Sequence, residues 1–550
     1  MTKRPIARMP GEAQDLNTEN QRWMSGRVRP RRSLLRAWIL PWILGWIVTG
    51  HLAAAASPPN LIVIMTDDQG YADVGFNGCT DIPTPHIDSI AANGVKFTSG
   101  YVAYSVCGPS RAAFMTGRYG QRFGFERNPQ YDPQDRGMGL PLSEDTMPSV
   151  LRRAGYHCGA IGKWHLGATE VHHPLNRGFH EFYGHLGGGH RYFPEELDIK
   201  DSAAAKNESE SYRTWILRGH EPVPPRKYLT DDFSDEAVEF VRRNHAKPFF
   251  LFLAYNAPHL PFAATEERLA RFGHIKDEKR RTYAAMVSAV DDGVGRVLEE
   301  LQKREIVDNT LVFFLSDNGG PHTKNGSRNT PLRGGKSDPW EGGIRVPFAA
   351  QWPSGLPRGV SYDHPVLSLD IFATIVGLSG VPIARERPLD GVNIVPYVTG
   401  KKRGIPHNAI FLRKYDQGIR AIRSGDDKMV LFEKTKQLSL FDLSKDISEK
   451  DRLSNPAKVR QLDQLWNDWN GSNIDPVFEG LTQLPDRKKK GKQARDGGKP
   501  ASTGGQTEAE KWKEAFFKRH PEADTDKDGN LSWAEQKAYK EKMDAKRPEK

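Results

Sequence analysis

The chain has 550 residues, a hydrophobic fraction of 37% and a formal net charge of +10 at pH 7. This length is enough for a large buried core and for more than one structural unit. The positive charge does not indicate nucleic-acid binding, because the basic residues cluster before residue 37 and at 488–492, without a helix-turn-helix, zinc-finger or stacking-aromatic pattern. The three cysteines, Cys79, Cys107 and Cys158, exclude a disulfide scaffold, match no zinc motif, and leave at least one thiol free.

The N-terminal segment is typical of an export signal. Arg31 and Arg32 precede a Leu-Leu pair, an apolar stretch runs from 37 to 48, and four alanines at 53–56 come before Ser57. This pattern predicts a signal peptide over 1–56, of twin-arginine or ordinary secretory type, and an exported protein that is periplasmic or extracellular. A membrane anchor is the alternative, but the stretch is shorter than the roughly 20 residues of a span, so we expect no stable membrane span after signal removal.

From residue 59 onward the chain alternates between predicted strands and helices. Apolar runs at 60–66, 249–254 and 310–316, with a shorter one near 158–161, predict buried strands. Segments 86–97, 146–167, 234–259 and 282–320 each begin with helical spacing, and the last three continue through a turn into a strand. Continuous apolar strands between helices favour an α/β fold with a large, mostly parallel sheet flanked by helices.

The pattern changes after about residue 385. Short alternating strands over 407–443 predict a smaller antiparallel subdomain, and 459–470 reads as a closing helix. We therefore divide the chain after the signal into a catalytic domain (57–385), a C-terminal subdomain (386–483), a linker (484–507) and a short charged module (508–550). The linker is rich in Lys, Gly, Ser and Pro, a composition that predicts disorder.

Polar residues follow each of the four predicted central strands. Because ligands of open α/β sheets bind beyond the carboxyl ends of the strands, we expect these side chains to share one rim. The oxygen donors among them favour a hard cation, calcium or magnesium. Helix capping would explain a single Asp, but not two adjacent ones together with a second Asp-Asn pair. The residues at this rim are Asp67, Asp68, Lys163, His165, His259, Asp317 and Asn318.

A further lysine, Lys336, lies in the Gly-rich stretch LRGGKSDPWEGGIRVP, whose glycines permit close approach of the backbone to a ligand. Positive groups beside a cation site indicate an anionic substrate of the phosphate or sulfate kind.

The segment CGPSRAAFMTGR at 107–118 resembles the signature of the sulfatase family, C-x-P-S-R followed by Thr-Gly-Arg. The resemblance extends over roughly 59–470 and includes IMTDDQGYADVG, GKWHLG, APH and SDNGG in the family's order; Phe114 stands where leucine is usual. It implies an alkaline phosphatase-like fold and a sulfuric ester hydrolase of the arylsulfatase or N-acetylgalactosamine-6-sulfatase type.

The resemblance also implies that Cys107 is oxidised to formylglycine by a formylglycine-generating enzyme. The hydrated aldehyde would be the nucleophile, and its second hydroxyl would allow release of the sulfate. In the family's pattern Arg111 would orient the diol, Lys163 would bridge diol and sulfate, and His165 would take a proton. His259 and Lys336 would bind sulfate and support protonation of the leaving group. Calcium, rather than magnesium, would be held by Asp67, Asp68, Cys107, Asp317 and Asn318.

The expected substrate is a sulfated carbohydrate, such as a galactose- or N-acetylgalactosamine-type polysaccharide or a glycosaminoglycan fragment. His190 and Arg191 in GGGHRY either contact a sugar or belong to a packed loop. Two other functions stay open at this point. One is hydrolysis of phosphonates or phosphodiesters on the same fold, and the other is binding of sulfated glycans by an unmodified, inactive domain.

The segment DTDKDGNLSWAE at 524–535 matches an EF-hand loop, which predicts a short helical EF-hand tail and a second calcium. Its predicted ligands are Asp524, Asp526, Asp528, Asn530, Ser532 and Glu535. An acidic solvated tail is the alternative interpretation.

Overall fold

The structure is a computed structural model that describes residues 58–383, 386–481, 521–523 and 525. The predicted signal peptide, the linker and the six predicted EF-hand ligands lie outside the described residues. Every element below belongs to the unit Ser57–Lys550.

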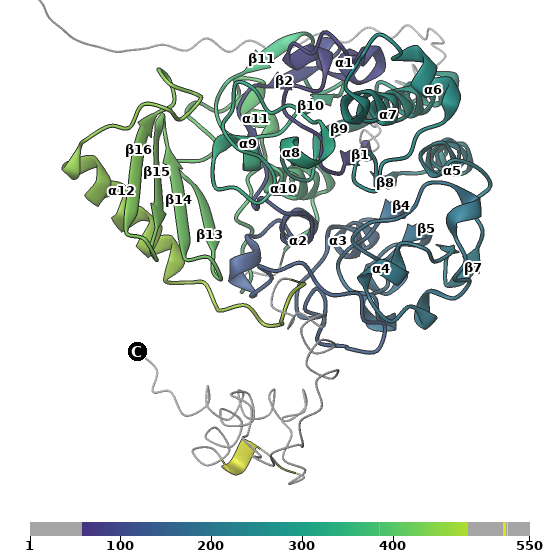
Figure 1. The fold of residues 1–550 in the computed structure, drawn as a ribbon, viewed down its shortest axis with the longest axis horizontal. Coiled ribbons are helices and arrows are strands. Elements are labelled where there is room, and N and C mark those ends of the chain that lie inside the picture. Colours follow the sequence, from purple (N-terminus) through teal and green to yellow (C-terminus); the bar gives the residue numbers. More distant parts are fainter. Residues whose placement is uncertain (1–57, 384–385, 482–520, 524, 526–550) are drawn as a thin grey trace, which may run out of the picture. The chain divides into compact units, whose positions relative to one another are not determined.

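A mixed sheet of ten described strands forms the centre of this unit, in the order β11-β2-β10-β9-β1-β8-β4-β5-β6-β7 (Figure 1). Its middle consists of β9 (Thr310–Ser316), β1 (Asn60–Thr66), β8 (Phe249–Ala254), β4 (His157–Lys163) and β5 (Glu181–His185), which all run parallel. The predicted large sheet with parallel central strands is confirmed. Toward both edges it gains antiparallel pairs that the helix–strand alternation did not reveal, because short strands leave little periodicity to read.

The outer strands build these edges. On one side β10 (Phe348–Gln351) runs antiparallel to both β9 and β2 (Val95–Phe97), and β11 (Val360–Tyr362) runs parallel to β2. On the other, β6 (Ile216–Arg218) and β7 (Glu221–Val223) extend the sheet as antiparallel strands.

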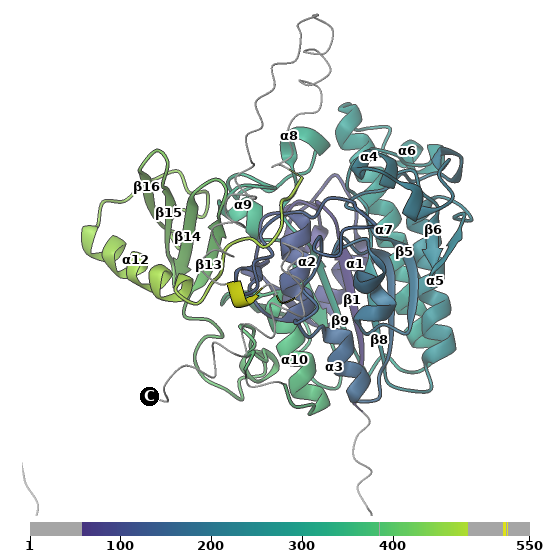
Figure 2. The same ribbon diagram turned by 90° about the horizontal axis from the view of Figure 1, so that it is seen from below.

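Helices cover both faces of the sheet (Figures 1 and 2). One layer contains α1 (Pro85–Ala92), α5 (Leu229–Asn244) and α7 (Glu278–Lys303). The opposite layer contains α2 (Cys107–Thr116), α3 (Met147–Arg153) and α10 (Leu369–Ser379). The predicted arrangement of a sheet between helical layers is confirmed.

The strand β1 shows why its sequence is an unbroken apolar run. Leu61, Val63 and Met65 pack into the core beneath α2 and α10, whereas Ile62 and Ile64 pack into the core beneath α1 and α7. All five side chains are essentially inaccessible to solvent. Full burial of such a side chain contributes about 1.5–3 kcal/mol, so both faces hold the strand, and the residues after it, in place.

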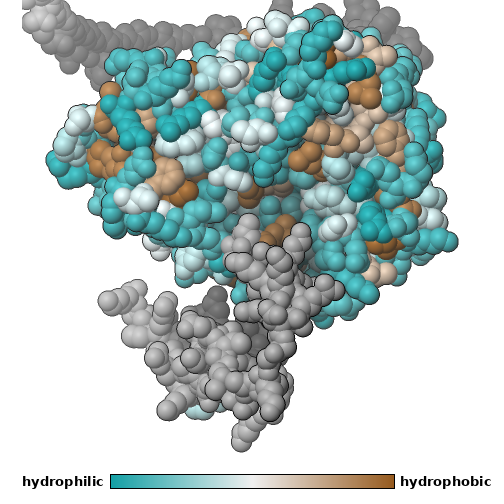
Figure 3. Space-filling view, in the orientation of Figure 1, coloured by the Kyte–Doolittle hydropathy of each residue, from teal (hydrophilic) through white to brown (hydrophobic). Residues whose placement is uncertain are grey.

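The C-terminal part forms a separate antiparallel sheet, as predicted. It consists of β13 (Ile410–Lys414), β14 (Ile419–Ser424), β15 (Asp427–Phe432) and β16 (Gln437–Asp442), with α12 (Pro456–Asn470) packed against it. Figure 3 shows that the visible face is largely hydrophilic, with apolar residues gathered over this sheet at the left. Leu438 and Leu453 are exposed apolar residues of this region.

Short elements complete the described part of the unit. Within the described ranges, none of the helices combines the length and apolar character needed to cross a bilayer. The short elements are β3 (Gly100–Tyr101), β12 (Val366–Leu367), α4 (Glu208–Ser211), α6 (Glu266–Arg271), α8 (His322–Asn325), α9 (Glu341–Ile344) and α11 (Val395–Val398).

A histidine before β13, whose side chain is 8% exposed, makes the stability depend on pH. His407 Nε2 lies 2.8 and 2.9 Å from the two carboxylate oxygens of Asp370 in α10. Burial lowers the pKa of His407, but the charge of Asp370 and its hydrogen bond outweigh it and raise the pKa above the ordinary value. The imidazolium therefore stabilises the fold below pH 6.5, and this contribution is lost as pH rises through the higher pKa of the folded state.

We expect His407→Gln to lower the free energy of unfolding by about 1–3 kcal/mol at pH 6, and by less at pH 9. Denaturant unfolding of wild type and variant at both pH values measures this difference. The exposed His274→Gln is the control and should change neither value by more than about 0.5 kcal/mol. An equal loss at pH 6 and pH 9 would contradict the ion pair.

Candidate active site

Four parallel strands bring the predicted polar residues together beyond the carboxyl ends of the strands. Asp67 and Asp68 follow β1, Lys163 ends β4, and Asp317 and Asn318 follow β9. His259 lies in the loop after β8, and His165 comes two residues after β4. The pairing of Thr66 with Ser316 places Asp67 and Asp317 side by side.

Cys107 is the first residue of α2, and its side chain faces the carboxylates. Its Sγ lies 3.5 Å from Asp67 Oδ1, while Asp67 Oδ2 accepts a 2.6 Å hydrogen bond from Lys163 Nζ. All three side chains are buried. Because the N-terminal end of a helix favours negative charge, the position suits an atom that attacks, or is bonded to, an anionic group.

Arg111, one turn further along α2, joins the helix to two strands. Its Nε donates to Asp317 Oδ2 at 2.9 Å, and a terminal nitrogen lies 2.8 Å from the same oxygen. The other terminal nitrogen donates to the backbone carbonyl of Lys163 at 3.2 Å. This buried guanidinium therefore fixes the distance between α2, β9 and β4.

Asp68 is surrounded by the remaining predicted groups. Lys336 Nζ lies 2.8 and 2.9 Å from its two oxygens, and Asn318 Nδ2 donates to Oδ1 at 2.7 Å. His259 Nε2 lies 3.6 Å from Asp68 Oδ2. The sequence-predicted residues are thus brought together in one cluster.

The backbone around this cluster includes unusual conformations. Asp68, His165 and Ser337 have φ values of 66°, 60° and 73°, which lie in the left-handed region that non-glycine residues rarely adopt. Such conformations persist where the surroundings enforce them, and they concentrate at functional sites. Here they turn the chain sharply after β1 and β4, and directly after Lys336.

The charges of the site hold its acids in different states. Burial raises the pKa of Asp67, but Lys163, His259 and Arg111 outweigh burial and keep that pKa far below its ordinary value. For Asp317, burial and the neighbouring charge of Asp67 raise the pKa to about 6, although Arg111 opposes them. Burial also raises the pKa of the Cys107 thiol to about 12. An unmodified Cys107 is therefore a thiol at neutral pH rather than a thiolate.

His165 is buried with neither ring nitrogen hydrogen-bonded within the described residues. Burial, and then the charge of Lys163, lower its pKa well below the ordinary value, so the ring is neutral and can accept a proton. His185 at the end of β5 is likewise buried without a hydrogen bond among the described residues, and its ring centroid lies 4.8 Å from that of His190 in a tilted arrangement. Burial, and then His190, lower the pKa of His185 well below the ordinary value. Sequence reasoning missed His185, because β5 was not recognised as a fifth strand ending at this site.

His190 itself belongs to the packed loop. Its Nδ1 and Nε2 lie 2.8 and 2.9 Å from the backbone carbonyls of Arg191 and Thr214, and Arg191 pairs with Glu196. Of the two alternatives for this segment, the structural one is correct for His190. Cys79 and Cys158 are free thiols, the first half-buried and the second buried.

The donor set fits a hard cation. Atoms of Asp67, Asp68, Cys107 and His259 all lie within 4.8 Å of one another, and Asn318 Oδ1 is buried without a hydrogen-bond partner among the described residues. The Nδ2 of the same amide donates to Asp68 Oδ1, so this oxygen lies on a side chain that contacts a carboxylate of the site. Amide and carboxylate oxygens are ligands of calcium and magnesium. His259 belongs to this close group, although the sequence-based set of metal ligands did not include it.

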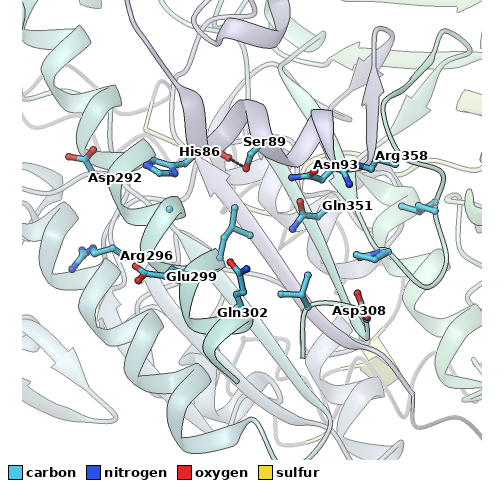
Figure 4. A pocket seen from close by; sticks show the side chains of 15 residues that line it. His86, Ser89, Asn93, Asp292, Arg296, Glu299, Gln302, Asp308, Gln351 and Arg358 are labelled. Atoms are coloured by element: carbon cyan, nitrogen blue, oxygen red, sulfur yellow. Dashed lines mark hydrogen bonds between the residues drawn. The ribbon is translucent and has the colours of Figure 1, made fainter. Parts of the chain in front are cut away.

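A pocket of about 930 Å³ lies elsewhere. Figure 4 shows side chains of α1, such as His86, facing side chains of α7, such as Arg296 and Glu299, across it. It also contacts Asp308, just before β9 begins, whereas the residues described above follow the end of β9. This pocket therefore lies near the amino-terminal end of β9, opposite the clustered residues, and none of them lines it.

Comparison with known proteins identifies the class to which this fold and site belong. The profile of the Sulfatase family matches residues 59–381, more than half of the chain. The chain belongs to the sulfatase family and is a sulfuric ester hydrolase.

The chain is similar to particular members of this family. The chain is 37% identical over 371 residues to N-acetylgalactosamine-6-sulfatase of Mus musculus, covering 63% of this chain and 68% of that protein. It is 30% identical over 516 residues to an uncharacterised sulfatase of Escherichia coli (strain K12), covering 76% and 87%. Among solved structures, Ps i-CgsB in complex with k-i-k-neocarrahexaose is 40% identical, with a TM-score of 0.73, covering 79% of this chain and 99% of that one.

Proposed function

We propose that the protein releases sulfate from a galactose- or N-acetylgalactosamine-type polysaccharide, or from a glycosaminoglycan fragment. The observation that carries this proposal is the position of Cys107 at the start of α2, where its Sγ lies 3.5 Å from the Asp67 carboxylate that also accepts a hydrogen bond from Lys163. The substrate class follows from the relatives, one of which is an N-acetylgalactosamine-6-sulfatase and one of which was solved with a neocarrahexaose.

The nucleophile in this proposal is formylglycine, made from Cys107 by a formylglycine-generating enzyme. Its hydrated aldehyde supplies a hydroxyl that attacks sulfur and a second one whose deprotonation releases the product. Asp67, Asp68, Asp317 and Asn318 would hold calcium beside residue 107, and the ion would supply positive charge for a sulfate oxygen and would lower the pKa of the diol.

The remaining roles belong to side chains of this chain. Arg111 is rigid because of its contacts with Asp317 and the Lys163 carbonyl, so it would orient residue 107. Lys163 and Lys336 would bind sulfate oxygens, because their pairs with Asp67 and Asp68 place two ammonium groups in the site. His165, neutral and without a hydrogen bond among the described residues, would accept a proton. His259 would support protonation of the leaving oxygen.

Export is part of the proposal. The N-terminal pattern predicts a periplasmic or extracellular protein, and a sulfated polysaccharide is a substrate found outside the cell membrane. The catalytic mechanism uses no residue of the predicted EF-hand, so we expect the module at 508–550 to be dispensable for hydrolysis.

Sulfate release from a panel of defined sulfated mono- and disaccharides tests the function, together with mass spectrometry of residue 107. We expect release from galactose-type sulfates, formylglycine in the mature protein, and a loss on the order of 10⁴-fold or more for Cys107→Ala. Chelation should abolish the release, and calcium should restore it. Faster hydrolysis of aryl phosphate than of aryl sulfate would instead indicate a phosphate or phosphonate hydrolase. An intact thiol with glycan binding but no release would indicate an inactive binding domain.

A further inference from the structure

A carboxylate that the proposed mechanism does not use lies beside His165. Glu208, the first residue of α4, has one oxygen, Oε1, that accepts a 3.0 Å hydrogen bond from the backbone N–H of Gly188. A Cβ on Gly188 would lie 2.6 Å from Glu208 Oε1 and 2.8 Å from His165 Nε2. The missing side chain at Gly188 therefore leaves Glu208 and His165 facing the same small space.

The second carboxylate oxygen has no partner of its own. Glu208 Oε2 is buried without a hydrogen bond of ordinary geometry among the described residues. Burial raises the pKa of Glu208, although the Gly188 N–H, the charge of Lys163 and the backbone of Tyr131 each oppose this rise. Asp67, Asp68 and Asp317 each pair with a lysine or arginine. Glu208 forms no such pair in the described part of the chain. A buried acceptor of this kind costs free energy unless a ligand supplies the donor.

The donor cannot be the sulfate group itself. Sulfate esters carry only acceptor oxygens and a negative charge, and the cations of Lys163 and Lys336 provide for them. What a sulfated sugar offers next to its sulfate is a free ring hydroxyl, which is a neutral donor. Sugar hydroxyls are bound well by carboxylates, because a hydrogen bond to a charged acceptor is about twice as strong as one between neutral groups.

We propose that Glu208 is a specificity-determining residue that accepts a hydrogen bond from the free hydroxyl next to the sulfated position of the sugar. This inference rests on the proposed function. It also predicts which sugars are bound poorly, since a second sulfate at that position would repel the Glu208 carboxylate. The protein should therefore prefer a monosulfated ring over the same ring with an adjacent second sulfate.

The variant Glu208→Gln reverses the chemistry of this position. The amide oxygen stays on the Gly188 N–H, so the NH₂ group takes the place of Oε2 and presents a donor where the carboxylate presented an acceptor. We expect kcat/KM for a monosulfated galactose to fall by about 10- to 100-fold. Hydrolysis of 4-nitrophenyl sulfate, which has no ring hydroxyl, should stay within about twofold. The preference for monosulfated over adjacent disulfated sugar should shrink.

Binding gives a readout that is independent of turnover. Calorimetric titration of the Cys107→Ala chain with the same monosulfated galactose, with and without Glu208→Gln, should show the same loss of affinity. The matched control is Glu210→Gln on the same helix, whose carboxylate bonds to Lys206 N and Asn207 Nδ2 instead. This control should leave both constants unchanged.

The outcomes separate this inference from the function on which it rests. If wild type hydrolyses and binds the monosulfated sugar, but Glu208→Gln does so equally well, only the inference is overturned. Equal losses on aryl sulfate and on sugar would likewise overturn it, since they would indicate a structural role. If no sulfated sugar of the panel is bound or hydrolysed by the wild type, the proposed substrate class fails, and the inference with it.

Discussion

Arg111→Met is expected to reduce sulfate release by on the order of 10³-fold or more, and to lower the free energy of unfolding by about 3–5 kcal/mol. The guanidinium is 1% exposed and Asp317 is inaccessible, so the variant leaves a buried carboxylate without its partner. It also removes the contact between α2 and the Lys163 carbonyl that positions residue 107 against the ends of β9 and β4.

The loss would have an electrostatic signature. Arg111 lowers the pKa of Asp317 against the effects of burial and of Asp67, so its removal raises that pKa further. A protonated Asp317 is a poor ligand for a cation, and the metal requirement of the variant should therefore increase. Residual activity measured against calcium concentration checks this expectation.

Two further variants make the result interpretable. Arg271→Met removes a half-exposed cation from Glu267 and Asp292, far from the site, and should cost no more than about 1 kcal/mol. The double variant Arg111→Met, Asp317→Asn should recover part of the stability, because no buried charge stays unpaired, but none of the activity. Full activity in Arg111→Met would contradict the positioning role.

Much of the cluster was predictable from the sequence, because four apolar runs show where the central strands end and which polar residues follow them. In 60–66 and 310–316 the predicted and observed strands coincide, and the residues that follow them must lie at the carboxyl edge of a parallel sheet. The physical reason is that these strands are buried on both faces, which leaves an unbroken apolar signal. Membership of the sulfatase family is now established, whereas the individual catalytic roles stay proposals.

What the sequence did not reveal depends on contacts between distant segments. The partner of Arg111 is 206 residues away, and the low pKa of His165 arises first from burial, to which the charges of Lys163 and Arg111 add. Glu208 carries no motif, and its short helix offers too few residues for a periodic signal. Such features follow from packing, which local pattern does not encode.

The C-terminal sheet is tied to the site by a buried ion cluster, and its disruption should have the second large effect. Lys428 Nζ in β15 lies 2.8 Å from Glu341 Oε1 and 2.8 Å from Glu449 Oε1. The Glu341 N–H donates to Glu449 Oε2 at 2.7 Å. Burial raises the pKa of Glu341, but Lys428 and Arg345 outweigh it and hold the pKa at about 2.

This cluster supports the loop that carries Lys336. Glu341 begins α9, five residues after Lys336. The residue that follows Lys336, Ser337, accepts a hydrogen bond at its carbonyl from Lys414 Nζ of β13. Ser337 N–H in turn donates to the carbonyl of Ser105, two residues before Cys107, at 2.7 Å. The contacts therefore run from the C-terminal sheet to both sides of the reacting centre.

We expect Lys428→Met to lower the free energy of unfolding by about 3–5 kcal/mol, because two buried carboxylates lose their common cation. Lys428 is 1% exposed and cannot contact the substrate. Sulfate release should nevertheless fall, because the displaced loop moves Lys336, and the loss should appear mainly as a higher KM. Chemical denaturation and steady-state kinetics measure the two effects. Lys445→Met, which removes a surface partner of Asp442, is the control and should be neutral within about 0.5 kcal/mol.

A triple variant tests whether the cost comes from unpaired charge or from lost packing. In Glu341→Gln, Lys428→Met, Glu449→Gln the lysine and both of its carboxylate partners are neutral, and only Arg345, 3.4 Å from Glu341, loses an anionic neighbour. Replacement of a buried ion cluster by neutral groups is often tolerated. The triple variant should therefore be more stable than Lys428→Met alone. If the triple variant is less stable than Lys428→Met, unpaired charge is not the source of the cost. The carboxylates of Glu341 and Glu449 would then stabilise the contact between the C-terminal sheet and the loop even without Lys428, and their hydrogen bonds would account for the coupling to Lys336.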